Sequence, residues 1–148
     1  MLVVFTRTEH GPGLDSAPYT AAFERRRRDP DDGVCLAGTW GAELAADVEP
    51  PAADEPVIVK HGYDAMSVAE LPALLAAAGR DTVVVSGVAT TLCVAATVAG
   101  AFERGLFPIV VREATAASNA AARRATLRWI DRYYGDVVPV ALITDAWR

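Results

Sequence analysis

Short runs of consecutive apolar residues alternate along the chain with segments whose apolar residues recur at helical spacing. The runs are rich in β-branched residues and lack polar alternation, which is typical of strands buried on both faces of a parallel sheet. The predicted strands are Leu2–Thr6, Pro56–Lys60, Thr82–Ser86, Phe107–Val111 and Val137–Ile143. Thr82–Ser86 is expected in the interior of the sheet.

Helical segments fill the intervals between these strands. Gly79 and Gly105 follow two of the helices, where C-terminal caps belong. Repeated strand–helix units imply right-handed crossovers, and therefore a three-layer α/β/α fold with a mainly parallel sheet. Because no linker or repeat interrupts the pattern, residues 1–148 are predicted to form a single domain. The predicted helices are Ala17–Arg27, Gly41–Asp47, Ala69–Ala78, Leu92–Arg104 and Ser118–Tyr134, and the third could also start at Ser67.

One cysteine stands at a joint between a strand and a helix. Cys93 falls in the first turn of a helix that is apolar on nearly every side, just beyond the strand Thr82–Ser86. Cys93 is therefore expected at the carboxyl edge of the sheet, which is where open α/β sheets bind their ligands. The helix dipole and the backbone N–H groups of the first turn favour a thiolate and can stabilise an oxyanion. A buried, unreactive cysteine is the alternative from position alone, and Cys35, which lacks this setting, is predicted to be structural.

Composition and charge narrow the class of protein. Hydrophobic residues make up 52% and charged residues 22% of the chain, as in globular proteins. No apolar run is as long as a membrane span, and the first residues do not resemble a signal peptide. The net charge of -5 disfavours nucleic acid as a partner, and the run Arg25–Arg28 is followed by acidic residues, as in a solvated segment. The two cysteines lack metal-ligand spacing, and nothing in the sequence suggests secretion. Reduced thiols in a cytoplasmic protein are therefore predicted. No membrane partner is expected.

Lys60 is the only lysine among the 14 basic residues of the chain. It ends a strand that is predicted to be buried. A lysine in this place usually extends its ammonium group into water, and a functional role is the competing hypothesis.

The segments "VVVSGVATTLCVAATVAGAFERG" and "IVVREATAA" resemble the signature region of the isochorismatase-like cysteine hydrolases. This superfamily includes nicotinamidases, N-carbamoylsarcosine amidases and ureidoacrylate-type amidases. The resemblance extends upstream through "CLAGTWGAEL" and "VIVKHGYDAM" and covers nearly the whole chain. It implies a Rossmann-like parallel sheet, an Asp–Lys–Cys triad, a small-molecule substrate, no cofactor, and a homodimer or larger homo-oligomer.

The resemblance also implies roles for individual residues. Cys93 matches the nucleophile and Lys60 the triad lysine. A cis peptide bond is expected between Val88 and Ala89, with the N–H groups of Ala89 and Cys93 forming an oxyanion hole. Thr90 is expected at the substrate, since its place ahead of the cysteine is similar to that in the carbamoyl-amidase members. The thiolate would attack an amide or ureido carbonyl, expel ammonia or an amine, and leave a thioester for hydrolysis.

The chain departs from the family pattern at its beginning. Its first residues, "MLVVFTRTEHGP", resemble the second family strand, so the strand that carries the triad aspartate is expected to be missing between Leu2–Thr6 and Thr82–Ser86. The true start could lie upstream, the chain could be artificially shortened, or it could be a natural remnant. The last case predicts a catalytically inactive domain used for binding or assembly. The nearby carboxylates of Glu9, Asp15 and Asp64 are expected to be solvated surface charges rather than substitutes for that aspartate.

A second departure concerns metal binding. Nicotinamidases have an Asp-x-His segment that holds a metal, whereas this chain has Thr8-Glu9-His10. No metal is therefore expected, and nicotinamidase activity is disfavoured. The presence of Cys93 favours hydrolysis of a carbon–nitrogen bond over the vinyl-ether cleavage of isochorismatases proper. A flavin- or nucleotide-binding domain is a weaker alternative, because no Gly-x-Gly-x-x-Gly follows a strand.

Overall fold

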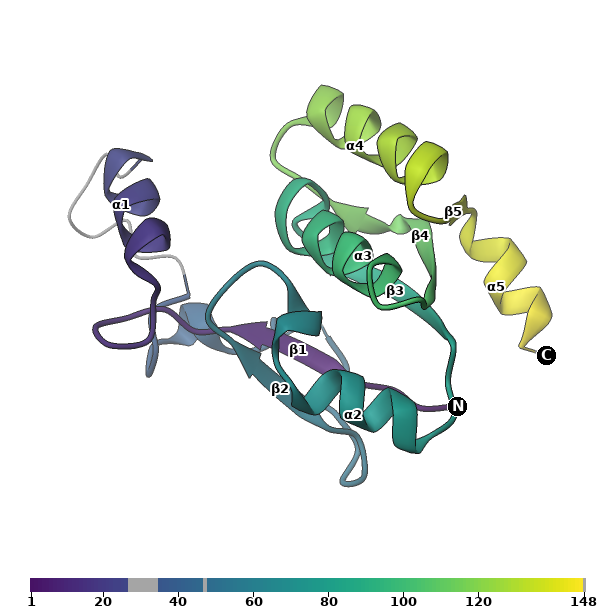
Figure 1. The fold of residues 1–148 in the computed structure, drawn as a ribbon, viewed down its shortest axis with the longest axis horizontal. Helices are drawn as coiled ribbons and strands as arrows, with labels where there is room; N and C mark the ends of the chain where they lie inside the picture. The colour runs from purple at the N-terminus through teal and green to yellow at the C-terminus, as the bar shows by residue number, and fades with distance from the viewer. Residues whose placement is uncertain (27–34, 47, 148) are drawn as a thin grey trace. The chain divides into compact units, whose positions relative to one another are not determined.

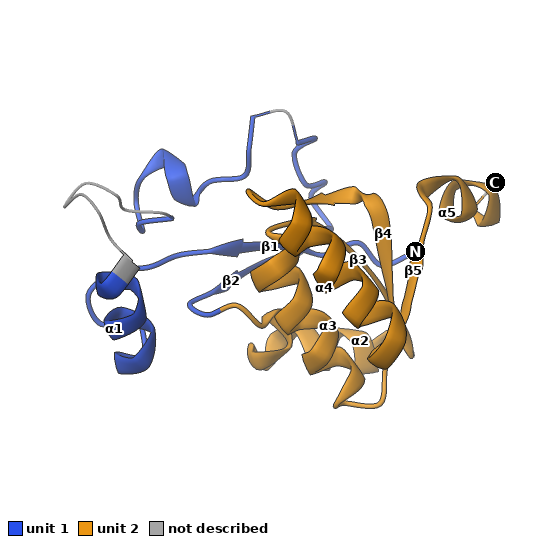
Figure 2. Ribbon diagram, turned by 90° about the horizontal axis from the view of Figure 1, so that it is seen from above, with its two compact units in different colours: residues 1–62 blue, residues 63–148 orange. Residues whose placement is uncertain are grey.

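The computed structural model of the chain describes residues 1–26, 35–46 and 48–147. The chain divides into two compact units, Met1–Gly62 and Tyr63–Arg148, which are coloured separately in Figure 2. Each unit contains its own parallel sheet. The α/β class and the parallel pairing predicted from the sequence are thus confirmed, while the single domain stays a prediction. Arg27, Arg28 and the acidic residues that follow them lie outside the described residues.

The first unit is built on two parallel strands, β1 (Phe5–Thr8) and β2 (Val57–Lys60), visible in Figure 1. Strand β1 starts later in the sequence than the predicted strand Leu2–Thr6. Pairing with the segment of β2 begins at Phe5, whose N–H donates to the Pro56 carbonyl. Helix α1 (Ala17–Arg26) follows β1.

The predicted helix Gly41–Asp47 is wrong over its described part. A single 3₁₀ turn, Trp40–Ala42, stands there instead, and Glu43 is already in an extended conformation. Short turns of this kind lack the repeated hydrogen bonds that sustain a helix. Asp47 lies outside the described residues.

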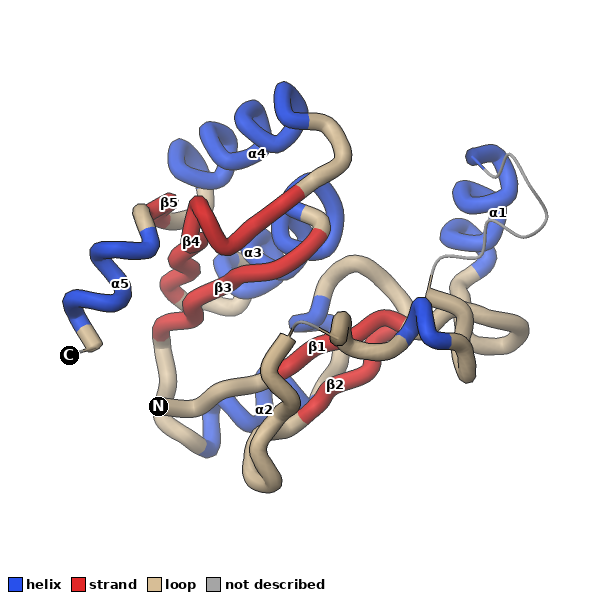
Figure 3. Tube along the Cα trace, turned by 180° about the vertical axis from the view of Figure 1, so that it is seen from behind, coloured by secondary structure: helices blue, strands red, loops and turns tan. Residues whose placement is uncertain are grey.

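The second unit contains a three-stranded parallel sheet in the order β3 (Thr82–Val88), β4 (Phe107–Ala116), β5 (Asp136–Val138). Strands β3 and β4 both run further than predicted, and Figure 3 shows the bend in β4. Their register shifts at this bend, since Val85 is opposite Val110 while Gly87 is opposite Thr115. The extra residues of β4 form a bulge that changes the direction of the strand end.

The prediction that Val137–Ile143 forms one strand is wrong beyond Val138. Pro139 cannot donate to a sheet ladder, and it occupies the N-cap of helix α5 (Val140–Ala146). Glu113 of β4 receives a hydrogen bond from the Val140 N–H at 2.9 Å. That bond, which favours the charged carboxylate, holds the pKa of Glu113 below its ordinary value.

Helices α3 (Ala95–Phe102) and α4 (Ala120–Tyr133) share one core with β4. Asn119 caps α4 by accepting a hydrogen bond from the Ala122 N–H. Phe102 at the end of α3 is 45% exposed. Helix α2 (Glu70–Ala77) has Pro72 in its first turn, where a proline is tolerated. The buried members of the shared core are Val94, Val98, Val110, Leu127 and Ile130.

Strand β3 lies at an edge of the three-stranded sheet, whereas the sequence predicted an interior position. Its Val84 is 39% exposed and its Val88 is 72% exposed, so the strand is not buried on both faces. Among the described strands, β1 pairs with β2 and β3 pairs with β4. The missing strand that was expected between Leu2–Thr6 and Thr82–Ser86 stays a prediction.

Within the part of the chain that the structure describes, every helix is too short or too polar to cross a lipid bilayer.

Candidate functional site

A tight turn begins at the last two residues of β3 and carries the cysteine. We refer to residues 87–94 as the Cys93 turn. Gly87 adopts φ +107°, a backbone conformation that favours glycine, and the peptide bond between Val88 and Ala89 is cis. Thr90–Val94 then form a π-helical turn, in which the Val94 N–H donates to the Ala89 carbonyl at 3.2 Å. Helix α3 continues directly from this turn, so Cys93 lies at the junction between strand and helix that the sequence predicted.

Two residues fix the Cys93 turn to the rest of its unit. Thr90 is completely buried, and its hydroxyl donates to the carbonyl of Ala116 at the end of β4. Val94 is 3% exposed and belongs to the core shared by α3, β4 and α4. Cys93 itself, between these anchors, is partly accessible. The structure therefore gives the Thr90 side chain a structural bond, and its contact with substrate stays a prediction.

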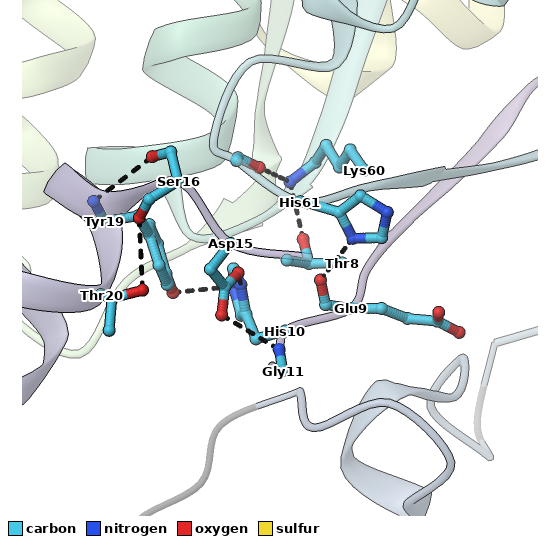
Figure 4. A network of polar contacts seen from close by, with 11 residues as sticks. Thr8, Glu9, His10, Gly11, Asp15, Ser16, Tyr19, Thr20, Lys60 and His61 are labelled. Carbon is cyan, nitrogen blue, oxygen red and sulfur yellow. Dashed lines mark hydrogen bonds and ion pairs between the residues drawn. The ribbon is translucent and has the colours of Figure 1, made fainter. Parts of the chain in front are cut away.

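Lys60 occupies the carboxyl end of β2 and is 3% exposed. Its Nζ donates to Thr8 Oγ1 at 2.6 Å and to the Gly62 carbonyl at 2.9 Å (Figure 4). Thr8 is also the residue opposite Lys60 in the parallel ladder of β1 and β2. This lysine is thus held inside its unit by neutral oxygens, unlike a strand-end lysine that extends into water.

The two predicted catalytic residues belong to different units. Lys60 lies in the first unit and Cys93 in the second. Lys60 ends β2 and Cys93 follows β3, so each lies at the carboxyl end of a parallel strand. Functional residues of α/β sheets are commonly found at these ends. Within the second unit the structure brings together Val88, Ala89, Thr90 and Cys93 in one turn. The catalytic roles of these residues and of Lys60 stay predictions.

A buried histidine lies close to the end of β1. His10 is 6% exposed; its Nδ1 is 2.6 Å from Asp15 Oδ1, and its Nε2 is 2.7 Å from the Tyr19 hydroxyl (Figure 4). The rings of Tyr19 and His10 also stack, with centroids 4.2 Å apart. Protein partners therefore engage both ring nitrogens, and the network ties α1 to the segment after β1. The described residues contain no group of three His, Cys, Asp or Glu side chains arranged to hold a metal ion.

The expectation that Glu9, Asp15 and Asp64 are solvated charges is wrong for Asp15, whose side chain is 13% exposed and pairs with His10. Glu9 forms an ion pair with Arg7 at 2.6 Å. Asp64 caps the 3₁₀ turn Ala65–Ser67 by accepting a hydrogen bond from the Met66 N–H at 2.7 Å. An acidic residue two positions before a turn amide is a recognisable capping signal, which the sequence analysis passed over.

Comparisons with known proteins identify the family to which the chain is similar. A family model described as the isochorismatase domain matches residues 1–141. The ureidoacrylate amidohydrolase RutB of Methylobacterium radiotolerans is 32% identical over 139 residues, which cover 92% of this chain and 54% of that protein. The maleamate amidohydrolase of Pseudomonas putida is 40% identical over 100 residues, covering 66% of this chain and 47% of that protein. The chain thus spans about half the length of these curated relatives.

Solved structures show the same fold. An isochorismatase-like hydrolase from Alkaliphilus metalliredigens superposes with a TM-score of 0.83 at 24% identity, over 99% of this chain and 74% of that one. The N-carbamoylsarcosine amidase of Thermoplasma acidophilum superposes with a TM-score of 0.75 at 28% identity, over 94% of this chain and 72% of that one. The family model covers nearly all of the sequence, and the strand–turn–helix unit around Cys93 lies inside the matched region. The chain therefore belongs to the isochorismatase domain family.

Proposed function

We propose that this chain carries the cysteine and the lysine of an amidohydrolase that cleaves a carbon–nitrogen bond in a small amide or N-carbamoyl substrate. The observation that carries the proposal is the placement of Cys93 in a fixed turn at the carboxyl end of a parallel strand. The family membership and the amidohydrolase relatives point to the same class of reaction. The substrate is a small molecule, and neither a metal nor an organic cofactor takes part in the proposed steps.

The reaction proceeds through a covalent intermediate on Cys93. The sulfur attacks the carbonyl carbon, so that a C–S bond forms, and the thiol proton ends on the nitrogen that leaves when the C–N bond breaks. Water then adds to the thioester carbon and the C–S bond breaks, which yields the acid and regenerates the thiol. The proposed products of the first half are a thioester and ammonia or an amine.

Backbone amides of the Cys93 turn serve as the oxyanion hole in this proposal. The N–H groups of Ala89 and Cys93 belong to the turn that Thr90 and Val94 hold in place. Donors fixed before the reaction begins stabilise the developing negative charge without reorganisation. Thr90 acts here through the position of the turn, because its hydroxyl is bonded to Ala116.

Lys60 supplies the positive charge that favours the thiolate form of Cys93. A lysine held by Thr8 and Gly62 is fixed in direction, and it loses less conformational freedom on binding a substrate than a solvated lysine does. The ammonium group also attracts a carbonyl or carboxylate oxygen of the substrate. Cytoplasmic location, which rests on the cysteine usage, and assembly into a homodimer or larger homo-oligomer, which rests on the family resemblance, are further parts of the proposal.

A substrate screen tests the proposed activity. The purified protein is incubated with primary amides, N-carbamoyl amino acids and ureido acids, and released ammonia is measured with a coupled dehydrogenase assay. We expect release from at least one class, and intact-protein mass spectrometry of the acid-quenched reaction should show an acyl adduct on the peptide that contains Cys93. Absence of both signals across the panel would favour an inactive domain used for binding or assembly.

A further inference from the structure

Three side chains of the first unit form a chain of hydrogen bonds that ends on a tyrosine hydroxyl (Figure 4). Asp15 Oδ1 lies 2.6 Å from His10 Nδ1, and His10 Nε2 lies 2.7 Å from the hydroxyl oxygen of Tyr19. The order carboxylate, imidazole, hydroxyl is the order of groups that activates a hydroxyl nucleophile in hydrolases. We call these three residues the Tyr19 relay. All of them belong to the unit Met1–Gly62, so the relay is complete within one unit.

The partners of the imidazole determine where its proton lies. An ionised Asp15 carboxylate can only accept hydrogen bonds, so in the neutral ring Nδ1 carries the proton and donates to Asp15. Nε2 then presents a lone pair, and the Tyr19 hydroxyl donates to it. His10 is thus oriented as a base toward the phenol. The Asp15 carboxylate stabilises the imidazolium that forms when His10 takes the proton.

Other contacts hold the relay in this geometry. The second carboxylate oxygen of Asp15 accepts a hydrogen bond from the Gly11 N–H at 3.0 Å. The His10 N–H donates to the Cys35 carbonyl at 2.9 Å, which fixes the backbone of the histidine. The side chains of His10 and Asp15 are 8% and 13% exposed, so water competes little for either group. The base is therefore fixed and shielded before any reaction begins.

Tyr19 is partly accessible, unlike the buried imidazole beside it. It lies in helix α1, where its ring stacks on that of His10 with centroids 4.2 Å apart. On the same helix, the ring of Phe23 is stacked with that of Tyr19 at a centroid distance of 6.3 Å. Aromatic rings favour planar apolar groups as neighbours. The surroundings of the hydroxyl therefore suit a small molecule with a planar group.

We propose that Tyr19 is a nucleophile, with His10 as its general base and Asp15 as the positioning residue of that base, and that it takes an acyl group from a small activated acyl donor. The phenol oxygen forms a bond to the acyl carbon, and the bond between that carbon and the leaving group breaks. The phenol proton passes to His10 Nε2 and from there to the leaving group. The product is an O-acyl tyrosine. Cys93 takes no part in this step, so the inference does not rest on the proposed function.

Acetylation of the purified protein by N-acetylimidazole, in which imidazole is the leaving group, tests the proposal. The four tyrosines of the chain serve as references for one another, and peptide mass spectrometry follows the acetyl group on each. Tyr133 is 48% exposed, so accessibility alone favours Tyr133 over the less exposed Tyr19. We expect the reverse order, with Tyr19 acetylated at least about tenfold faster, because general-base catalysis contributes about 10²–10⁴-fold.

Three variants assign the effect to the relay. His10→Gln keeps a hydrogen-bonding side chain but removes the base, and should bring the rate of Tyr19 acetylation to within about threefold of the reference tyrosines. Asp15→Asn should slow Tyr19 acetylation by about tenfold or more at an unchanged melting temperature, because a neutral amide does not stabilise the imidazolium. His61→Gln is the matched control. The Nδ1 atom of His61 bonds a backbone carbonyl and not a hydroxyl, so this variant should change the rate less than about twofold.

Three results would overturn the proposal. If Tyr19 in the parent is acetylated no faster than Tyr133, the relay does not activate the hydroxyl, and this comparison needs no variant. If Tyr19 acetylation stays fast in a folded His10→Gln protein, His10 is not the base. Faster acetylation of all four tyrosines in Asp15→Asn, with a lower melting temperature, would show that Asp15 supports the fold and does not position the imidazole.

Discussion

Replacing Cys93 by alanine should reduce hydrolysis by a factor on the order of 10³ or more and abolish the acyl adduct. The reason is that the alanine variant has no nucleophile, so the remaining backbone donors can only polarise the carbonyl. Stability should change little, because the substitution removes one partly accessible sulfur atom from the turn. The measurement is the initial rate of ammonia release on the best substrate of the panel, together with a thermal melt.

Cys35→Ala provides the matched control for this prediction. Cys35 has the same side chain and is also partly buried. It lies in a turn before Trp40–Ala42, and its backbone φ is +57°. Its replacement should leave the rate within about twofold of the parent, since structural cysteines are inert. Equal losses of activity for both variants would contradict a specific role for Cys93.

Truncating Ile130 to alanine should lower the free energy of unfolding by about 2–5 kcal/mol. Ile130 is 1% exposed and packs in the same core as Val94, the residue after Cys93. The substitution leaves a cavity on the side of α4 that supports the Cys93 turn. Urea titration followed by circular dichroism measures the change.

The control for this prediction is Leu142→Ala in α5. Leu142 is 56% exposed, so its truncation removes little buried area and should shift the unfolding free energy by less than about 0.5 kcal/mol. A loss for Leu142→Ala that equals the loss for Ile130→Ala would show that the described core does not determine stability.

The continuous apolar runs located β2, β3 and β4, although β3 is not buried on both faces. The run Val137–Ile143 misled the prediction, since an apolar run alone does not distinguish a strand from a helix. Pro139 divides that run, and a proline that opens a helix is a signal the sequence contained. The edge position of β3 was not predictable from its residues, because strand order depends on contacts between distant parts of the chain.

The candidate site was predictable where a local pattern carries the chemistry. Cys93 was predicted to follow a strand and a tight turn, and the structure has this order, although β3 extends past Gly87 to Val88. The partners of Lys60 were harder to predict, because Thr8 is distant in the sequence and becomes a neighbour through the pairing of β1 with β2. Asp15 was misjudged for a similar reason, since its buried partner His10 is identified by packing and not by spacing.

The proposed dependence of Cys93 reactivity on Lys60 can be measured through the rate at which iodoacetamide alkylates Cys93. Iodoacetamide is applied at pH 7 to the parent, Lys60→Ala and the charge-preserving Lys60→Arg, and modification of the Cys93 peptide is measured against that of the Cys35 peptide. We expect Lys60→Ala to slow alkylation of Cys93 by about three- to tenfold, Lys60→Arg to retain part of the parent rate, and the alkylation rate of Cys35 to be unchanged. Equal Cys93 rates in the parent and in Lys60→Ala would contradict the proposed dependence.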